Sequence, residues 1–262
     1  MILALDIGNS SIVAGGFQGK KLLFTARLRT DSTKTSDEYC IDLMSILEVY
    51  GHDREEVTGS IIASVVPQVT NACKTALRKL SSREPLIVGP GLKSGLNLKI
   101  ENPALIGADL VVGSVAALQE HKPPMIVVDM GTATSMTVLD ETGALVGGSI
   151  CPGVQVSLDA LTSRTALLPG LQLDQPRRAI GKNTIECMRS GVMLGAASML
   201  DGMVARMEQE LGSKTTVILT GRIAKFIAPL CRTPMVYDSN LTLKGLAALY
   251  LENQNELEKN EK

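Results

Sequence analysis

The chain has few of the side chains on which several kinds of site depend. It contains no tryptophan, aromatic residues make up 3% of it, and its only histidines are His52 and His121. Both histidines stand in polar stretches, where we expect surface loops. Histidine-rich metal chemistry and serine-hydrolase chemistry are therefore poor candidates.

Cysteine pairs, net charge and long apolar runs are equally limited. The five cysteines are scattered, with no Cys-x-x-Cys pair, which argues against a zinc site or a disulfide framework. A net charge of −1 gives no reason to expect nucleic acid or an anionic membrane as a partner. No apolar run approaches the roughly 20 residues that span a bilayer. The N-terminus reads as a strand ending in a charge and not as a signal peptide, so we expect a cytoplasmic protein.

What the chain does have is aliphatic bulk and length. Hydrophobic residues make up 45% of it, which supports a substantial core of aliphatic side chains. A length of 262 residues is enough for two domains.

A short phrase occurs twice, at residues 2–11 and 126–135. Each copy is an apolar run that ends in Asp-x-Gly, with Asp6 and Gly8 in the first and Asp129 and Gly131 in the second. One copy alone is better explained as a plain hairpin turn. Two copies favour carboxylates delivered into glycine-containing hairpins that approach a polyphosphate. We expect a duplicated fold, with domains 1–121 and 122–262 and a nucleotide in the cleft between them.

The predicted elements follow the same order twice. The first half has strands at 2–7, 11–17, 21–28, 60–66 and 86–88 and helices at 36–50, 68–80 and 104–119. The second has strands at 125–129, 134–139, 144–150, 216–219 and 235–237 and helices at 153–163, 183–211, 222–228 and 241–251. Ser36 is the expected N-cap of the first helix, and the polar tail 252–262 is expected to fray. This α/β plan resembles the ribonuclease-H-like core of the actin, sugar-kinase and acetate-kinase superfamily of ATP-binding proteins.

Four further stretches could carry chemistry. Asp109 opens a helix, where it either complements the helix dipole or takes a proton from a substrate hydroxyl. Gly147 and Gly148 interrupt a strand, because of either the close approach of a ligand or tight packing of the two halves, and Gly153 starts a helix that could receive an anion. The long irregular stretch 165–184 ends at a helix start whose N-cap is Asn183 or Thr184, and loops of this length are often functional. Residues 219–221 end a strand and could seat a nucleobase or ribose.

Together these phrases resemble the type III pantothenate kinases over nearly the whole chain. The matching phrases are Asp6-x-Gly-Asn-Ser, Asn102-Pro…Gly107-Ala-Asp109, Asp129-x-Gly-Thr-Ala-Thr134, Gly147-Gly-x-Ile-x-Pro-Gly153, Thr165-Ala-x-Leu-Pro169 and Ile180-Gly-Lys-Asn-Thr184. The resemblance implies ATP-dependent phosphorylation of the primary hydroxyl of pantothenate, the first step toward coenzyme A. It also implies a homodimer and a need for Mg²⁺ and a monovalent cation.

The resemblance also implies roles for particular residues. Asp109 would be the general base, Asp129 would bind K⁺ or NH₄⁺, and Thr132 would touch ATP. Asp6 would bind Mg²⁺, and the ATP phosphates would be held by the segment made of Asp6, Ile7, Gly8, Asn9, Ser10, Ser11, Ile12 and Val13. The substrate would contact Ile100, Gly107, Ala108, Asp109, Leu110 and Thr184, the last from the neighbouring subunit.

The chain departs from the family pattern at several positions. Leu110 stands where the family has Arg, Ile100 where it has Tyr, Gly113 where it has Asn, and Arg222 where it has the second Gly of Thr-Gly-Gly. A lost hydrogen bond to a charged group costs on the order of 1.5–3 kcal/mol, or about 10- to 150-fold in binding. The alternatives are therefore a kinase for a related hydroxylated acid or amide, or a nucleotide-binding regulatory protein with little catalysis. The presence of all three carboxylates favours an enzyme.

Overall fold

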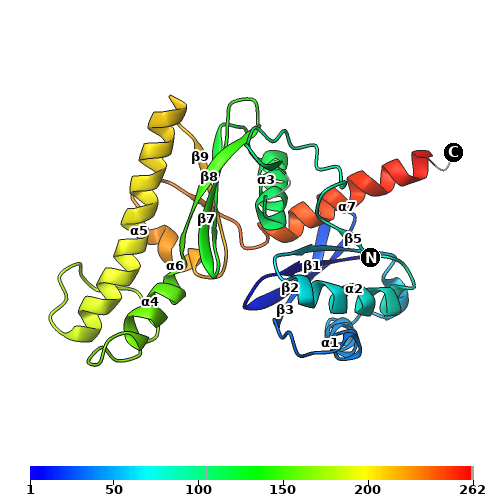
Figure 1. The fold of residues 1–262 in the computed structure, drawn as a ribbon, viewed down its shortest axis with the longest axis horizontal. Helices are drawn as coiled ribbons and strands as arrows, with labels where there is room; N and C mark the ends of the chain where they lie inside the picture. Colours follow the sequence, from blue (N-terminus) through cyan, green and yellow to red (C-terminus); the bar gives the residue numbers. More distant parts are fainter. Residues whose placement is uncertain (104–105, 261–262) are drawn as a thin grey trace. The chain divides into compact units, whose positions relative to one another are not determined.

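The computed structural model describes residues 1–103 and 106–260. Within these residues the strands form two five-stranded mixed sheets (Figure 1). The first has the order β3-β2-β1-β4-β5, and the second, read from the corresponding edge, has the order β8-β7-β6-β9-β10. Because the strand order is the same in both, the structure confirms the duplicated α/β fold.

The chain divides into two compact units. The first unit comprises residues 1–96, 102–119 and 240–262, and the second comprises residues 97–101 and 120–239. The elements of the first are β1 (Ile2–Ile7), β2 (Ser11–Gln18), β3 (Lys21–Arg29), α1 (Ser36–Val49), η1 (Arg54–Glu56), β4 (Gly59–Ser64), α2 (Pro67–Ser81), β5 (Leu86–Ile87), α3 (Ala108–Glu120, whose last residue the division assigns to the second unit) and α7 (Leu241–Asn260). Those of the second are β6 (Met125–Met130), β7 (Ala133–Leu139), β8 (Leu145–Pro152), α4 (Val154–Ser163), α5 (Thr184–Leu211), β9 (Thr216–Thr220), α6 (Ala224–Ile227), η3 (Ala228–Leu230) and β10 (Val236–Tyr237).

The central strand of the first sheet is buried on both faces. Leu3, Leu5 and Ile7 of β1 belong to the core that includes the buried side chains of α1 and α2. Ile2 and Ala4 belong to the core that includes those of α3 and α7. Alternate side chains of a strand point to opposite faces, so Asp6 lies on the face that α3 and α7 cover. This double burial explains why the sequence there is apolar without alternation.

The last helix belongs to the first unit, whereas the expected division at residue 121 placed it in the second domain. Leu243, Leu246 and Leu249 of α7 are buried in the core of the first unit, so the chain returns to its first half. The predicted end of this helix at 251 was wrong, because α7 continues to Asn260. An amphipathic pattern shows that a helix has a buried face, but it does not show which sheet covers that face.

Other helix boundaries also differ from the prediction: α2 starts one residue earlier than expected, α4 and α5 start one residue later, and α6 starts two residues later. The N-cap of α1 is Thr35 and not Ser36, because Thr35 forms a capping box: its Oγ1 accepts from the Glu38 N–H at 3.3 Å, and Glu38 Oε2 accepts from the Thr35 N–H at 2.7 Å. Helix α3 begins at Ala108, whereas the expected start at residue 104 lies outside the described residues. Among the described residues, no helix is both long enough and apolar enough to cross a membrane.

Candidate functional site

The first Asp-x-Gly phrase forms the turn between β1 and β2. Asp6 pairs with Val13 across the two strands, and the Gly8 N–H donates to the Ser11 carbonyl at 3.0 Å. Thr30 braces this turn from the end of β3, since its hydroxyl donates to the Gly8 carbonyl at 2.6 Å. The turn therefore presents Asn9 and Ser10, which are exposed, on a braced backbone.

Not every residue of segment 6–13 can reach a ligand with its side chain. Ile7 and Ile12 are fully buried in the core with α1 and α2, so they can offer only main-chain groups. Sequence reasoning missed one cation beside this turn, Arg27 of β3, whose Nη1 donates to Ser11 Oγ at 2.6 Å. The strand register that brings Arg27 opposite Val13 was the signal that could have found it.

Asp109 lies in the first turn of α3 and is half-buried. Its Oδ1 would lie only 2.4 Å from a Cβ built on Gly107, so the carboxylate folds back over that glycine. Gly107 also accepts from the Leu110 N–H at 3.1 Å, which closes the turn. The structure thus brings together three of the predicted acceptor-binding residues, Gly107, Ala108 and Asp109, with the apolar side chain of Leu110 directly after them.

Ile100 lies in the second unit, whereas Leu110 lies in the first. The segment around Ile100 runs beside the start of β8: the Lys99 N–H donates to the Leu145 carbonyl, and the Leu145 N–H donates to the Asn97 carbonyl, both at 2.8 Å. Lys99 Nζ also pairs with Asp140 at 2.8 Å. Gly113, the other departure on α3, is buried.

The second Asp-x-Gly phrase forms the turn between β6 and β7. Asp129 pairs with Ser135, so this turn is one residue shorter than the first, and the Gly131 N–H donates to the Ala133 carbonyl at 2.9 Å. Thr132 is exposed at its tip. Its carbonyl accepts from the Gly153 N–H at 3.0 Å, which joins the turn to the start of α4.

Glycine at three positions of the second unit makes room for neighbouring carbonyl groups. A Cβ on Gly153 would lie 2.4 Å from the Gly131 and Thr132 carbonyl oxygens, and a Cβ on Gly148 would lie 2.2 Å from that of Met136. A Cβ on Gly221 would lie 2.6 Å from the Met130 carbonyl oxygen. The Gly148 contact is with the neighbouring strand β7, which is neither of the two reasons expected for the glycines of β8, a ligand or tight packing of the two halves.

Thr184 is the first residue of α5, and Asn183 is its N-cap, accepting from the Glu186 N–H at 2.9 Å. The preceding loop is fastened to this helix: the Lys182 N–H donates to Glu186 Oε2 at 3.0 Å, and Ser190 Oγ donates to the Ala179 carbonyl at 2.6 Å. The hydrogen bond from Lys182 is the main reason that the pKa of Glu186 lies below its ordinary value.

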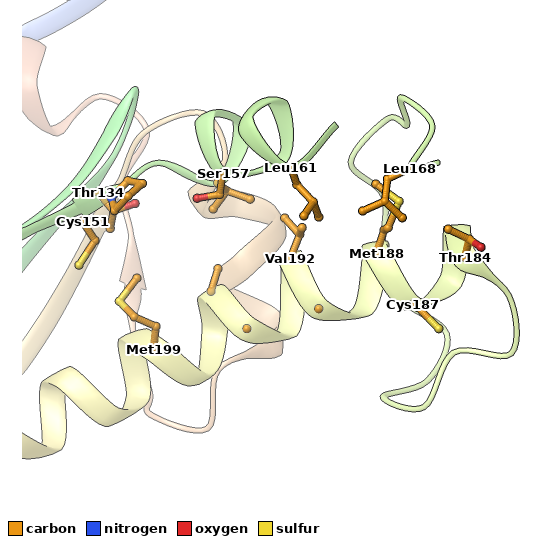
Figure 2. A pocket seen from close by; sticks show the side chains of 15 residues that line it. Thr134, Cys151, Ser157, Leu161, Leu168, Thr184, Cys187, Met188, Val192 and Met199 are labelled. Atoms are coloured by element: carbon orange, nitrogen blue, oxygen red, sulfur yellow. The ribbon is translucent and has the colours of Figure 1, made fainter. Parts of the chain in front are cut away.

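A pocket of about 790 Å³ lies between α4, α5 and the loop that carries Leu168 (Figure 2). Its wall is largely apolar and comes from two helices, the ends of β7 and β8, and that loop. The lining residues are Thr134, Cys151, Pro152, Val154, Ser157, Leu161, Leu168, Thr184, Cys187, Met188, Gly191, Val192, Gly195, Ala196 and Met199. The pocket was not predicted from the sequence. The α5 residues that line it recur every three or four positions from Thr184 to Met199, a spacing that places them on one face of the helix.

The residues present fit the groups expected here. Mg²⁺ is usually held by one or two carboxylates together with substrate phosphates and water, a role that Asp6 can fill. Asp129 Oδ1 and the Met130 carbonyl oxygen both lie against Gly221, where a Cβ would displace them, so two hard oxygen atoms share one cradle suited to a cation. In the part of the chain that the structure describes, no three histidine, cysteine or carboxylate side chains cluster as a metal site.

The fold places the chain in a known structural class. The activator of the 2-hydroxyisocaproyl-CoA dehydratase from Clostridium difficile, solved with bound ADPNP, matches this chain with a TM-score of 0.58 at 13% identity. The match covers 100% of this chain and 97% of the activator chain. The ROK hexokinase from Thermus thermophilus matches with a TM-score of 0.50 at 14% identity, over 97% of this chain and 99% of the hexokinase chain. With the duplicated sheet order, these likenesses define the actin-like ATPase and sugar-kinase fold.

The sequence narrows this class to one family. A family model described as type III pantothenate kinase matches residues 2–206. The type III pantothenate kinase of Moorella thermoacetica is 41% identical over 253 residues, which are 97% of this chain and 100% of that protein. The chain belongs to the type III pantothenate kinase family, as the sequence motifs predicted.

Proposed function

We propose that this protein transfers a phosphoryl group from ATP to the primary hydroxyl of pantothenate, giving 4′-phosphopantothenate in the first step of coenzyme A synthesis. The observation that carries the proposal is the family match over residues 2–206, with 41% identity to a type III pantothenate kinase over 97% of the chain. The braced Asp6 hairpin and the Asp109 helix start support it, since each presents a carboxylate from a rigid turn.

The proposed roles follow from where each side chain lies. When bound, ATP with Mg²⁺ supplies the phosphoryl group and a metal that neutralises its developing charge. Asn9 and Ser10 at the exposed tip of the first turn, together with Thr132, hold phosphate oxygens, and the Asp6 carboxylate holds the metal. Asp109 accepts the proton of the attacking hydroxyl at a carboxylate oxygen. Asp129 holds K⁺ or NH₄⁺.

Release of ADP from ATP and Mg²⁺ in the presence of pantothenate tests this function. We expect pantothenate-dependent turnover that increases with K⁺ or NH₄⁺ and falls about 10²- to 10⁴-fold in Asp109→Asn. Glu141→Gln is the matched control, because Glu141 is an exposed carboxylate in the β7–β8 turn and its loss should leave the rate unchanged. Absence of pantothenate-dependent turnover in the parent protein would refute the proposal.

Leu110 favours one alternative acceptor class. It follows Asp109 directly, is half-buried and apolar, and offers no charge to a substrate carboxylate. A hydroxylated amide or a less acidic relative of pantothenate would suit such a position better. The same assay decides between these acceptors. Turnover with such an acceptor and none with pantothenate would change the proposed substrate, while the proposed phosphoryl transfer would stand. Nucleotide binding without turnover on any acceptor would instead indicate a regulatory protein.

We further propose that the protein is a homodimer whose subunits meet along a stripe of α5, the exposed face that carries Gly191 and Gly195. Gly191 and Gly195 lie in the middle of this helix, where each costs about 1 kcal/mol relative to alanine. A Cβ on either would meet nothing within 4 Å, so packing within the subunit does not require glycine there. Close approach of a second helix would require it. Leu161 beside the stripe and Ile180 in the loop before α5 are exposed apolar side chains that a partner would cover.

Sedimentation at micromolar concentration tests the dimer. We expect a dimer for the parent protein and a monomer for Gly195→Arg, which places a long cation on the stripe. Ala205→Arg is the control, since Ala205 is exposed on the same helix but outside the pocket. A monomeric parent would contradict the proposal and, with it, a contribution of Thr184 across subunits.

We also propose a cytoplasmic location. All five cysteines are free, and Cys73 and Cys231 are held as thiols by burial, which raises the pKa of Cys73 to about 12 and that of Cys231 to about 11. Unpaired thiols are typical of proteins in a reducing compartment. Fractionation of the native cells, with the protein outside the soluble cytoplasmic fraction, would contradict this.

A further inference from the structure

Gly221 lies directly after β9 and is in contact with the Asp129 carboxylate. Its φ is +96°, a backbone conformation that L side chains rarely adopt. A Cβ at this position would lie 2.8 Å from Asp129 Oδ1 and 2.6 Å from the Met130 carbonyl oxygen. Two independent constraints, conformation and space, therefore require glycine here.

The strand register explains why these atoms meet. β9 runs parallel to β6, with Thr220 opposite Asp129. The chain turns at Gly221 just past this pair, so its backbone passes the end of β6 where Asp129 and Met130 stand. Thr220 is buried and fixes the end of β9 at this point. Gly131 lies close on another side, since a Cβ there would be 4.0 Å from the same carboxylate oxygen.

We infer that Gly221 is a positioning residue for the monovalent-cation site at Asp129. Its bare backbone lets a carboxylate oxygen and a main-chain oxygen lie against the same surface, and both are hard oxygen ligands of the kind that K⁺ requires. A methyl group at 221 pushes both oxygens away, because neither can keep its position at 2.6–2.8 Å from a carbon atom. This inference rests on the proposed role of Asp129 as the cation ligand.

Gly212 provides a matched control for the strain that alanine introduces. It is the C-cap of α5, has a φ of +73°, and a Cβ there would meet nothing within 4 Å. Gly212→Ala and Gly221→Ala therefore share the cost of an L residue at positive φ, but only the second crowds Asp129. Any difference between them in cation response comes from the contact.

The experiment measures the rise in Tm caused by KCl, against choline chloride at equal ionic strength, in the full chain without substrates. We expect K⁺ to raise the Tm of the parent protein and of Gly212→Ala with similar half-saturating concentrations. In Gly221→Ala we expect that concentration to increase about 10- to 100-fold, the range typical for loss of a residue that orients a metal ligand. The K⁺ concentration that half-activates pantothenate phosphorylation should shift by the same factor.

Each other outcome overturns the inference in a distinguishable way. If Gly221→Ala responds to K⁺ like the parent, Gly221 does not position the site. If Gly212→Ala loses the response equally, strain alone accounts for the effect. If the parent has pantothenate kinase activity but no K⁺ response, the cation role of Asp129 fails and there is no site for Gly221 to position, while the kinase function stands.

Discussion

Gly153 shows how one residue can join two parts of a site. It is the N-cap of α4, its N–H donates to the Thr132 carbonyl, and a Cβ there would lie 2.4 Å from two carbonyl oxygens of the β6–β7 turn. The sequence predicted only that this glycine starts a helix whose free N–H groups could receive an anion. The structure shows packing against the turn that carries Thr132.

We predict that Gly153→Ala lowers the free energy of unfolding by about 1–3 kcal/mol, because the methyl group overpacks a backbone junction. The displaced Thr132 turn should also raise the KM for ATP. Urea unfolding and steady-state kinetics measure the two effects. Gly170→Ala is the control, since a Cβ there meets nothing within 4 Å. Equal stabilities of the two variants would disprove the contact.

Asp140 gives the second unit a pH-dependent contact. Its pKa lies well below the ordinary value of 3.8, first because of Lys99 and then because of Thr142, which both donate to its carboxylate. A lowered pKa in the folded state means that the contribution is complete above the ordinary value and is lost as the pH falls below it. Lys99 and Asp140 tie segment 97–101 to the β7–β8 turn.

We therefore predict that the stability of the parent protein falls more steeply than that of Asp140→Asn as the pH is lowered from about 5 to about 2. The two stability curves should converge at the acid end. Urea unfolding at a series of pH values measures the curves. Parallel curves would show that the carboxylate contributes nothing to folding.

At the scale of elements, α3 and α7 approach each other closely at Gly245. A Cβ on Gly245 of α7 would lie 2.2 Å from the Val112 carbonyl oxygen of α3. This approach allows both helices to bury their aliphatic side chains in the core beneath β1 and β4. Since Asp109 lies in the first turn of α3, the contact also fixes the helix that carries the proposed base.

We predict that Gly245→Ala destabilises the protein by at least about 1–3 kcal/mol and lowers turnover, because α3 must move away. Gly202→Ala, also within a helix but with open space around its Cβ position, should instead be neutral or stabilise by up to about 1 kcal/mol. Thermal unfolding and ADP release measure both. A harmless Gly245→Ala would mean that the helices adjust without cost.

Helix boundaries and surface stripes were predicted unequally well. The capping signal of α1 was recognised one residue too late, because Thr35 and Ser36 both carry hydroxyl groups and only the hydrogen bond to Glu38 distinguishes them. The N-cap of α5 was predicted as Asn183 or Thr184, and it is Asn183. The pocket beside α5 was not predicted, because small residues on one face of a helix indicate a pocket only when that face is known to be exposed.

At the scale of the whole molecule, the last helix completes the first unit. Leu243, Leu246 and Leu249 are buried among β1, β4 and α3, and Asn253 bonds both the N–H and the carbonyl of Lys93. We predict that a chain ending at Ser239 loses cooperative unfolding of the first unit, whereas a chain ending at Gln254 keeps it. Hydrogen exchange of β1 and β4 amides measures the difference. Full protection of these amides in the shorter chain would contradict the role of α7.

The duplicated architecture could be read from the sequence because the repeated phrase and the order of elements both encode it. The matching strand order of the two sheets and the family match confirmed that prediction. The packing of α7 against the first sheet could not be predicted from the sequence, because the same aliphatic helix can pack on many sheet faces. The roles of Asp6, Asp109 and Asp129 stay predictions that depend on the experiments above.

The return of α7 also sets an order of events during synthesis. The chain of the second unit is complete at residue 239, while the first unit waits for residues 240–262. As the protein leaves the ribosome, the half made first is therefore completed only after the second unit has been made, and the face of β1 that α3 and α7 cover stays only partly covered until α7 emerges. A pause in translation between residue 239 and the end of α7 would leave part of an aliphatic sheet open to chaperones, although the second unit had already been made.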